Sequence, residues 1–160
     1  MTANEQLIQQ FYAAFQQKDY KTMQESYGDN ATFDDSVFSN LDAKQVKAMW
    51  QMLISSSKDM TMTFGNIKEN GNKVTAYWEA HYTFSATGKK VINKINAAFE
   101  IENGKIIKHT DSFDFYKWAK QAFGFGGFLL GWTNTFKEKV RQTAKKKLDQ
   151  YLEKLINSNG

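Results

Sequence analysis

The chain has no cysteine, and its 160 residues include only two histidines. The absence of cysteine excludes disulfide bonds, thiolate zinc sites and a cysteine nucleophile. Two histidines are too few for a metal site built from several imidazoles, so we expect no metal and no cofactor. His81 and His109 also fall on opposite faces of the predicted sheet, so they cannot share a metal ion.

The sequence also has no run of about 18 apolar residues, the length that a membrane-spanning helix needs. Its first residues, MTANEQLIQQFYAAF, lack the basic segment and apolar core of a signal peptide. We therefore expect a cytoplasmic protein. The net charge of +4 comes from one segment, because Lys137 to Lys154 holds seven basic and three acidic residues.

Hydrophobic periodicity predicts helices first and strands afterwards. Apolar residues at helical spacing predict helices over 4–17 and 20–27 and a third helix that begins after Asp42. Between them, the sequence predicts a turn at 28–30 and a short strand or extended arm over 31–38. Alternating residues predict strands over 60–70, 73–86, 91–102 and 105–116, with Asn-Gly turn signals at 70–71 and 103–104. This order favours an α+β fold with a curved antiparallel sheet wrapped around the N-terminal helices.

The last predicted strand carries a titratable pair on an apolar face. Its alternate residues are Ile107, His109, Asp111, Phe113 and Phe115, so an imidazole and a carboxyl group point the same way. Burial raises the pKa of such a carboxyl group and a neighbouring cation lowers it, which suits proton abstraction next to a carbonyl group. The alternative is a structural pair that is hydrogen-bonded across the sheet to Asn93 or Trp78.

Two stretches carry a resemblance to a known family. DNATFDDSVF (29–38) resembles the aspartate-rich arm at the pocket mouth of the SnoaL-like branch of the nuclear transport factor 2 (NTF2)-like superfamily, and GKIIKHTDSFD (104–114) is similar to the last strand of its polyketide cyclases. The resemblance covers roughly residues 4 to 125. It implies a cone-shaped fold with a pocket for a small hydrophobic molecule, and it places the acid/base group at Asp111.

The resemblance also implies a set of site residues. We expect Asp111, His109 and Asp35 to be catalytic, and the pocket to be lined by Tyr12, Phe15, Trp50, Trp78, Asn93 and Phe113. The oxyanion hole of the ketosteroid isomerases is not expected, because Phe11 stands where their tyrosine would be. The Asp-Arg-Asp set of the epoxide hydrolases is not expected either, because the single arginine, Arg141, lies in the tail.

The C-terminal quarter has two features outside this resemblance. FGFGGFLLGW (123–132) has too many glycines for a good helix and predicts an ordered loop that packs its aromatic side chains, either as a structural plug or as a lid on the pocket. Residues 133–160 predict a basic amphipathic helix that extends a domain of residues 1–132. We expect this helix to pack on the domain or on a dimer partner. An anionic membrane or an acidic protein is the alternative partner, and nucleic acid is not expected.

Two functions are compatible with these observations. The first is a cofactor-independent isomerase, cyclase or dehydratase that acts on a small hydrophobic carbonyl compound. The second is a non-catalytic module that binds a ligand or a protein partner. In both cases we expect a homodimer.

Overall fold

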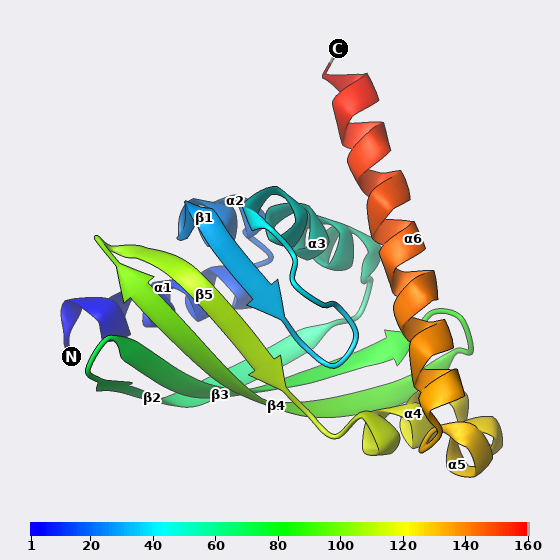
Figure 1. Cartoon of the computed structure of the whole chain (residues 1–160). Helices are drawn as coiled ribbons and strands as arrows, with labels where there is room; N and C mark the ends of the chain where they lie inside the picture. Colours follow the sequence, from blue (N-terminus) through cyan, green and yellow to red (C-terminus); the bar gives the residue numbers. More distant parts are fainter. Residues whose placement is uncertain (160) are drawn as a thin grey trace.

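The computed structural model describes residues 1–159, and it has the α+β architecture that the sequence predicts (Figure 1). Five strands form one curved sheet in the order β1-β5-β4-β3-β2. Their bounds are β1 Tyr27–Asp34, β2 Thr61–Asn70, β3 Lys73–Phe84, β4 Lys89–Glu102 and β5 Lys105–Ser112. The helices are α1 Ala3–Gln16, α2 Tyr20–Glu25, α3 Ala43–Ser56, α4 Phe115–Phe123, α5 Phe125–Leu130 and α6 Asn134–Ser158. None of the helices within residues 1–159 is long and apolar enough to span a bilayer.

The N-terminal helices begin at residues whose side chains cap them. The Thr2 and Asp42 side chains accept hydrogen bonds from backbone amides three residues later, and Glu5 and Gln45 bond back to the two cap residues. These reciprocal pairs satisfy donors that a helix start leaves free. The α1 and α3 helices then bury their apolar faces against the concave side of the sheet.

The short strand or extended arm predicted over 31–38 is confirmed as a strand for residues 31–34, but β1 begins earlier than predicted, at Tyr27. The segment expected to be a turn, 28–30, belongs to β1, and the second helix ends at Glu25 rather than at residue 27. The β1 strand pairs with β5 in parallel, with Phe33 opposite His109. A long-range parallel partner leaves no local turn signal, so the sequence pattern could not show it.

The predicted hairpins of β2, β3, β4 and β5 are confirmed, with one change of face and an earlier end. The β5 strand ends at Ser112 rather than at residue 116, so Phe115 begins α4 and does not belong to the strand face. Asn103 and Gly104 both have positive φ, as expected of an Asn-Gly turn. A bulge next to this turn pairs Ile101 with Ile106. The bulge buries Ile106 completely and leaves Ile107 half-buried, so the prediction that Ile107 shares the inner face is wrong.

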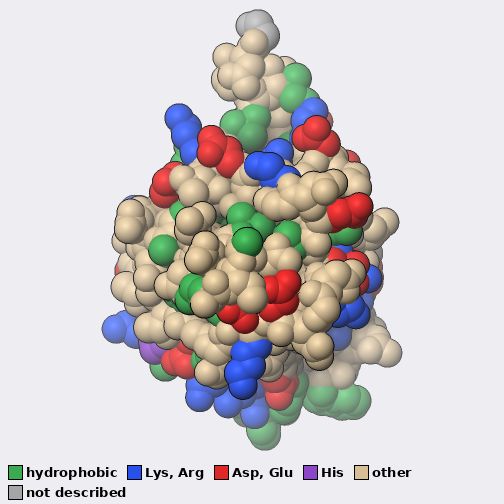
Figure 2. All heavy atoms as spheres, turned by 90° about the vertical axis from the view of Figure 1, so that its left-hand side faces the viewer, with side chains coloured by type: hydrophobic (Ala, Val, Ile, Leu, Met, Phe, Trp, Pro, Cys, Tyr) green, Lys and Arg blue, Asp and Glu red, His purple; other side chains and the backbone are tan. Residues whose placement is uncertain are grey.

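The glycine-rich segment is a helix rather than an ordered loop. The α5 helix packs closely on α4, because a side chain at Gly127 would overlap the carbonyl oxygen of Ala119. The end of the sheet is filled instead by α4, whose Phe115 and Trp118 pack against Val91. The aromatic side chains of α5 face outward. Figure 2 shows hydrophobic side chains projecting at the lower end of the molecule, which is the end where Figure 1 places α5.

The long helix α6 turns back from α5 and rises along the molecule toward α3 (Figure 1). Leu148 is its one fully buried side chain within the described residues and joins the main core. Arg141 adds a polar contact, because its Nε donates a hydrogen bond to the carbonyl oxygen of Ser36 at 3.0 Å. The helix therefore contacts the rest of the chain at two places along its length, through Arg141 and through Leu148. The division into a domain of residues 1–132 and an extension of 133–160 stays a prediction, and residue 160 lies outside the described residues.

Candidate active site

A chain of three hydrogen bonds lies inside the sheet and ends at Asp111. The Trp50 indole Nε1 is 2.9 Å from the Tyr27 hydroxyl oxygen, and this oxygen is 2.8 Å from His109 Nδ1. His109 Nε2 is 2.8 Å from Asp111 Oδ1. His109 is 0% exposed and Asp111 is 4% exposed. This geometry confirms the prediction that the side chains of His109 and Asp111 both point into the interior of the protein.

With a neutral His109, the donors and acceptors of this chain run in one direction. An indole N–H can only donate, so the Tyr27 oxygen accepts from Trp50 and has its own hydrogen free for His109 Nδ1. The histidine then carries its hydrogen on Nε2 and donates it to Asp111. Burial raises the pKa of the Tyr27 hydroxyl well above its ordinary value, so Tyr27 stays protonated as this direction requires.

Asp35 is the second carboxyl group near this chain, and it follows the end of β1. Its Oδ1 accepts hydrogen bonds from the amides of Val37 and Phe38 at 2.7 and 2.6 Å. Burial raises the pKa of Asp35 to about 6, and the charge of Asp111 adds to this effect. The two amides oppose it. Asp35 can therefore hold or release a proton near neutral pH.

Asp35 and Asp111 line one open cleft of about 290 Å³. The cleft is bounded by the ends of β1 and β5 and by the first turns of α6, which supply Lys137 and Arg141. The other lining residues are Asp34, Ser36, Thr110, Ser112 and Phe113. The expectation that the tail position of Arg141 separates it from the aspartates is wrong, because α6 folds back over the end of β1. An arginine and three aspartates, Asp34, Asp35 and Asp111, thus share the cleft.

The predicted pocket aromatics lie deeper than this cleft and pack against one another. Tyr12, Phe15, Trp50 and Trp78 are almost fully buried, and the rings of Phe15 and Trp78 have centroids 5.2 Å apart. The Tyr12 hydroxyl and the Trp78 Nε1 are buried without a hydrogen-bond partner among residues 1–159. Their positions make these four residues part of the core, and their contact with a substrate stays a prediction.

Of the remaining predicted pocket residues, Phe113 lies at the cleft and Asn93 does not. Phe113 lines the cleft next to Asp111. Asn93 lies opposite Ala80, whereas Asp111 lies opposite Ala97, four residues farther along β4 and hence about 13 Å away by strand rise. The expected contacts of the His109–Asp111 pair with Asn93 or Trp78 are not found. The polar partner is Tyr27.

Sequence reasoning missed Tyr27 and Arg141 as members of the site. Tyr27 was assigned to the end of a helix, although a tyrosine two residues beyond a capped six-residue helix is equally compatible with the start of a strand. For Arg141, a signal was present. It is the single arginine among many lysines, and arginine is the residue that proteins use for fixed, directional contacts with carboxyl and carbonyl groups.

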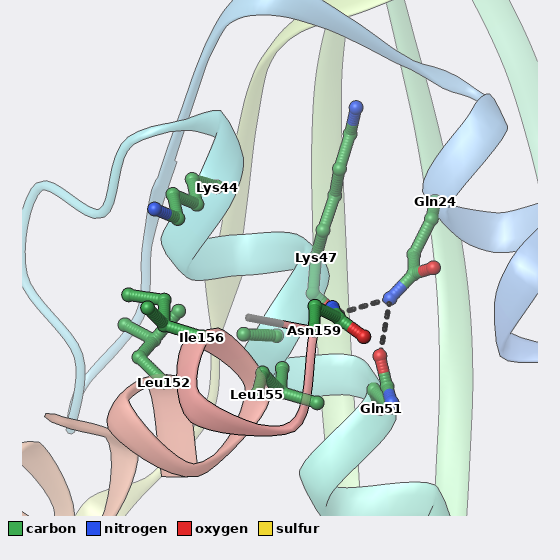
Figure 3. A pocket seen from close by; sticks show the side chains of 9 residues that line it. Gln24, Lys44, Lys47, Gln51, Leu152, Leu155, Ile156 and Asn159 are labelled. Carbon is green, nitrogen blue, oxygen red and sulfur yellow. Dashed lines mark hydrogen bonds between the residues drawn. The ribbon is translucent and has the colours of Figure 1, made fainter. Parts of the chain in front are cut away.

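A larger groove of about 470 Å³ lies between α3 and the end of α6 (Figure 3). Its floor is apolar, with Leu152, Leu155 and Ile156, and its rim carries Lys44 and Lys47. Gln24 bonds to the Lys47 carbonyl oxygen and to the Gln51 side chain across one edge. Its lining residues within 1–159 carry no carboxyl group and do not include the His109–Asp111 pair, so we do not place the site there.

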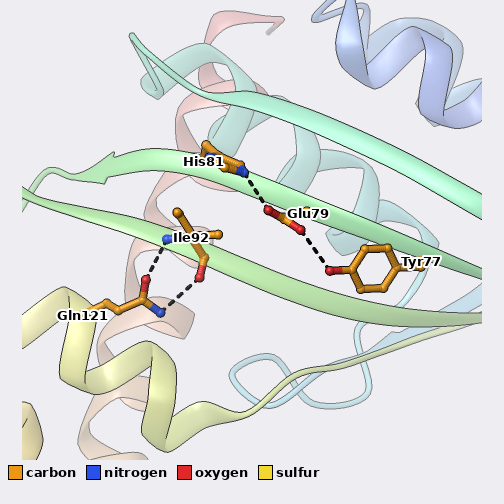
Figure 4. Close-up of polar contacts among 5 residues, drawn as sticks. All are labelled: Tyr77, Glu79, His81, Ile92 and Gln121. Carbon is orange, nitrogen blue, oxygen red and sulfur yellow. Dashed lines mark hydrogen bonds and ion pairs between the residues drawn. The ribbon is translucent and has the colours of Figure 1, made fainter.

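The outer face of the sheet carries the second histidine (Figure 4). Glu79 accepts hydrogen bonds from the Tyr77 hydroxyl at 3.0 Å and pairs with His81 Nε2 at 2.8 Å. The Gln121 side chain bonds to the Ile92 main chain and fixes α4 to the neighbouring strand. His81 is thus separated from His109 by the sheet, as predicted. Among residues 1–159, no group of three His, Asp or Glu side chains is arranged to hold a metal ion.

Comparison with known proteins agrees with this architecture. The family model described as a SnoaL-like domain matches residues 8–109. No curated protein is similar enough to match the chain.

Three solved structures illustrate the likeness in fold. An LEH-like epoxide hydrolase from M. tuberculosis is 18% identical, with a TM-score of 0.63 over 79% of this chain and 92% of its own. A candidate polyketide cyclase from Xanthomonas campestris pv. campestris is 19% identical, with a TM-score of 0.64 over 75% and 96%. An NTF2-like protein of unknown function from Burkholderia pseudomallei is 14% identical, with a TM-score of 0.64 over 76% and 98%. At these identities the likeness shows the fold alone, and the expected NTF2-like fold is confirmed.

Proposed function

This chain belongs to the SnoaL-like domain family, and on that premise we propose that it is a cofactor-independent enzyme that moves a proton on a small hydrophobic carbonyl compound. The reaction class is isomerisation, cyclisation or dehydration. The reacting atoms of the substrate would lie in the cleft between the end of β1, the end of β5 and the start of α6.

The observation that carries this proposal is the pair of carboxyl groups in one cleft with different surroundings. Asp35 has its pKa raised to about 6 by burial and by its neighbour Asp111. Asp111 accepts a hydrogen bond from a fully buried histidine that is itself held by Tyr27. Two carboxyl groups in unlike environments can divide the roles of acid and base between them.

The roles follow from position. Asp111 takes a proton from the carbon next to the carbonyl group, and Asp35, when protonated, donates a proton at a second atom of the substrate. Arg141 and Lys137 bind the oxygen on which negative charge develops. His109 has no exposed surface, so it acts as a positioning residue for Asp111. Phe113 contacts the apolar part of the substrate at the rim of the cleft.

The test is exchange of hydrogen for deuterium next to the carbonyl group of small hydrophobic ketones, followed by NMR with the whole chain. We expect Asp111→Asn to lower the exchange rate at least about 100-fold. Asp34→Asn is the matched control, because it removes the same charge from the same cleft and should leave the rate nearly unchanged. Equal rates for the wild type and Asp111→Asn would refute the proposal. Epoxides belong in the same screen, because Arg141 shares the cleft with aspartates.

A second candidate is a non-catalytic binding module, and the packed interior favours it. Phe11 alone makes edge contacts with the rings of Tyr12, Tyr27 and Trp50, which leaves the centre of the cone filled by the protein's own side chains. In that case hydrophobic ligands would bind the wild type and Asp111→Asn equally, and no ligand would be turned over. We also expect a cytoplasmic homodimer, which sedimentation analysis and fractionation of cells would test.

A further inference from the structure

Five large apolar side chains project from α5 and the turn that follows it. Phe125 and Trp132 are 74% and 71% exposed, and Phe128, Leu129 and Leu130 are each about half exposed. We call these five residues the α5 tip. Other exposed apolar residues, such as Leu53 and Ile92, are scattered over the surface and need no explanation. A continuous group of five in eight residues marks a binding surface.

The α5 tip is held rigidly in its exposed position. Gly127, on the side of α5 that faces α4, and Gly131, which follows the helix, both lie too close to Ala119 for larger side chains. The bulky residues are therefore directed outward and have no space to turn inward. Two further hydrogen bonds fix the segment: the Tyr116 hydroxyl donates to the Phe128 carbonyl oxygen, and the Trp132 indole donates to the Leu129 carbonyl oxygen.

Basic side chains surround the α5 tip. Within eight positions of the tip on either side, the sequence holds four basic residues, Lys117, Lys120, Lys137 and Lys139, and one acidic residue, Glu138. Lys120 lies over the ring of Tyr116, the residue that binds α5, and the Lys89 side chain lies beside Gly124. On the other side, α6 begins two residues after Trp132 and brings Lys137 and Lys139.

Exposed apolar side chains next to basic side chains favour one class of partner. A second copy of the chain would bring the same positive charge to the contact, and the two copies would repel each other. A bilayer with anionic headgroups offers an apolar interior for the phenylalanines and leucines, an interface for the tryptophan, and negative charge for the lysines. We propose that the α5 tip and its surrounding lysines bind the surface of an anionic phospholipid bilayer. This inference does not depend on the proposed enzymatic function.

The fluorescence of Trp132 can report insertion of the α5 tip into a bilayer. Trp50, Trp78 and Trp118 are buried, whereas Trp132 lies in the α5 tip. The full-length protein is mixed with vesicles of phosphatidylcholine alone or of phosphatidylcholine with phosphatidylglycerol. Flotation measures binding, and tryptophan emission measures insertion. We expect flotation and a blue shift of the emission with the anionic vesicles only, both weakened by added salt. Trp132→Phe should abolish the blue shift.

Three variants test which residues of the α5 tip and its surrounding lysines bind the vesicles. Phe125→Ser combined with Phe128→Ser should weaken binding at least about tenfold through the loss of inserted apolar area. Lys120→Gln combined with Lys139→Gln should weaken it by a similar factor. Ile92→Ser, which changes an exposed apolar residue on the outer face of the sheet, is the control and should bind as the wild type does. Absence of binding to anionic vesicles would overturn the proposal, as would unchanged binding by the double phenylalanine variant. The proposal would also be overturned if the wild type bound no lipid and formed a dimer that the double phenylalanine variant dissociates.

Discussion

The hydroxyl oxygen of Tyr27 lies 2.8 Å from Nδ1 of His109, although 82 positions in the sequence separate the two residues. Both groups are buried, and the same hydroxyl accepts the indole hydrogen of Trp50. One oxygen atom therefore connects α3, β1 and β5. Its removal leaves two buried polar groups without partners, which makes it a sharp test of the network.

We expect Tyr27→Phe to lower the free energy of unfolding by about 2–4 kcal/mol, since each unsatisfied buried group costs about 1–3 kcal/mol. Urea unfolding followed by circular dichroism measures the change. Tyr12→Phe is the matched control, because the Tyr12 hydroxyl is equally buried and has no partner to lose. This control should be as stable as the wild type or slightly more stable. A comparable loss in both variants would show that ring packing rather than the hydrogen bonds is responsible.

The close packing of α5 on α4 predicts opposite effects for two neighbouring glycines. Gly127→Ala should destabilise the protein by about 2 kcal/mol or more, because the new methyl group overlaps the Ala119 carbonyl and one helix must shift. Gly126→Ala meets no atom within 4 Å and should be neutral or stabilising by up to about 1 kcal/mol. Thermal unfolding of both variants checks this, and equal melting temperatures would contradict the packing.

The raised pKa of Asp35 predicts how stability changes with pH. The pKa is about 6 in the folded chain against an ordinary 3.8, so the folded state binds the proton more tightly than the unfolded state does. The stability from this group is therefore fully present below about pH 3.8 and is lost as the pH rises through about 6. The loss is at most about 3 kcal/mol, at about 1.4 kcal/mol per pKa unit.

Asp35→Asn removes this titration and can keep the hydrogen bonds from Val37 and Phe38, which both go to Oδ1. We expect the variant to be more stable than the wild type at about pH 8 and to lose that advantage toward about pH 4. Urea unfolding over this pH range measures it. Asp34→Asn removes the same charge from the same cleft and serves as the electrostatic control. An advantage that does not change with pH would argue against a raised pKa.

Leu148 anchors α6, and its truncation should release the helix. Leu148 is 1% exposed and joins the main core, so we expect Leu148→Ala to cost about 2–5 kcal/mol and to increase cleavage of α6 by trypsin. Ile156→Ala, at a half-exposed side chain in the groove near the end of the same helix, should change both properties much less. Rapid cleavage of the wild type would show instead that α6 is not anchored.

How far the sequence predicted the molecule depended on the range of the interactions involved. Alternation along one strand correctly predicted that His109 and Asp111 share the inner face, because the two-residue period is a local property. The hairpins were predictable for the same reason, since Asn103 and Gly104 encode their own turn. The bulge that places Ile106 instead of Ile107 on the inner face has no comparable local signal in the sequence.

The errors arose where distant segments meet. Glycine's low helix propensity predicted a loop at α5, but Gly127 and Gly131 are the residues that allow α5 to approach α4, and this packing outweighs the propensity. Arg141 was judged by its position in the tail, whereas the hydrogen bond that brings it to the cleft spans 105 positions. Neither contact follows from periodicity, because each depends on a second segment that the local pattern does not contain.

The parallel pairing of β1 with β5 has a consequence for synthesis on the ribosome. The β1 strand emerges first but gains its partner only after β5 has followed, so its edge stays unpaired in the nascent chain while β2, β3 and β4 are made. Residues 137 and 141 emerge later still. A nascent chain that has reached the end of β5 thus holds the three aspartates but not the basic side of the cleft. The cleft is completed only after α6 has left the exit tunnel and folded back.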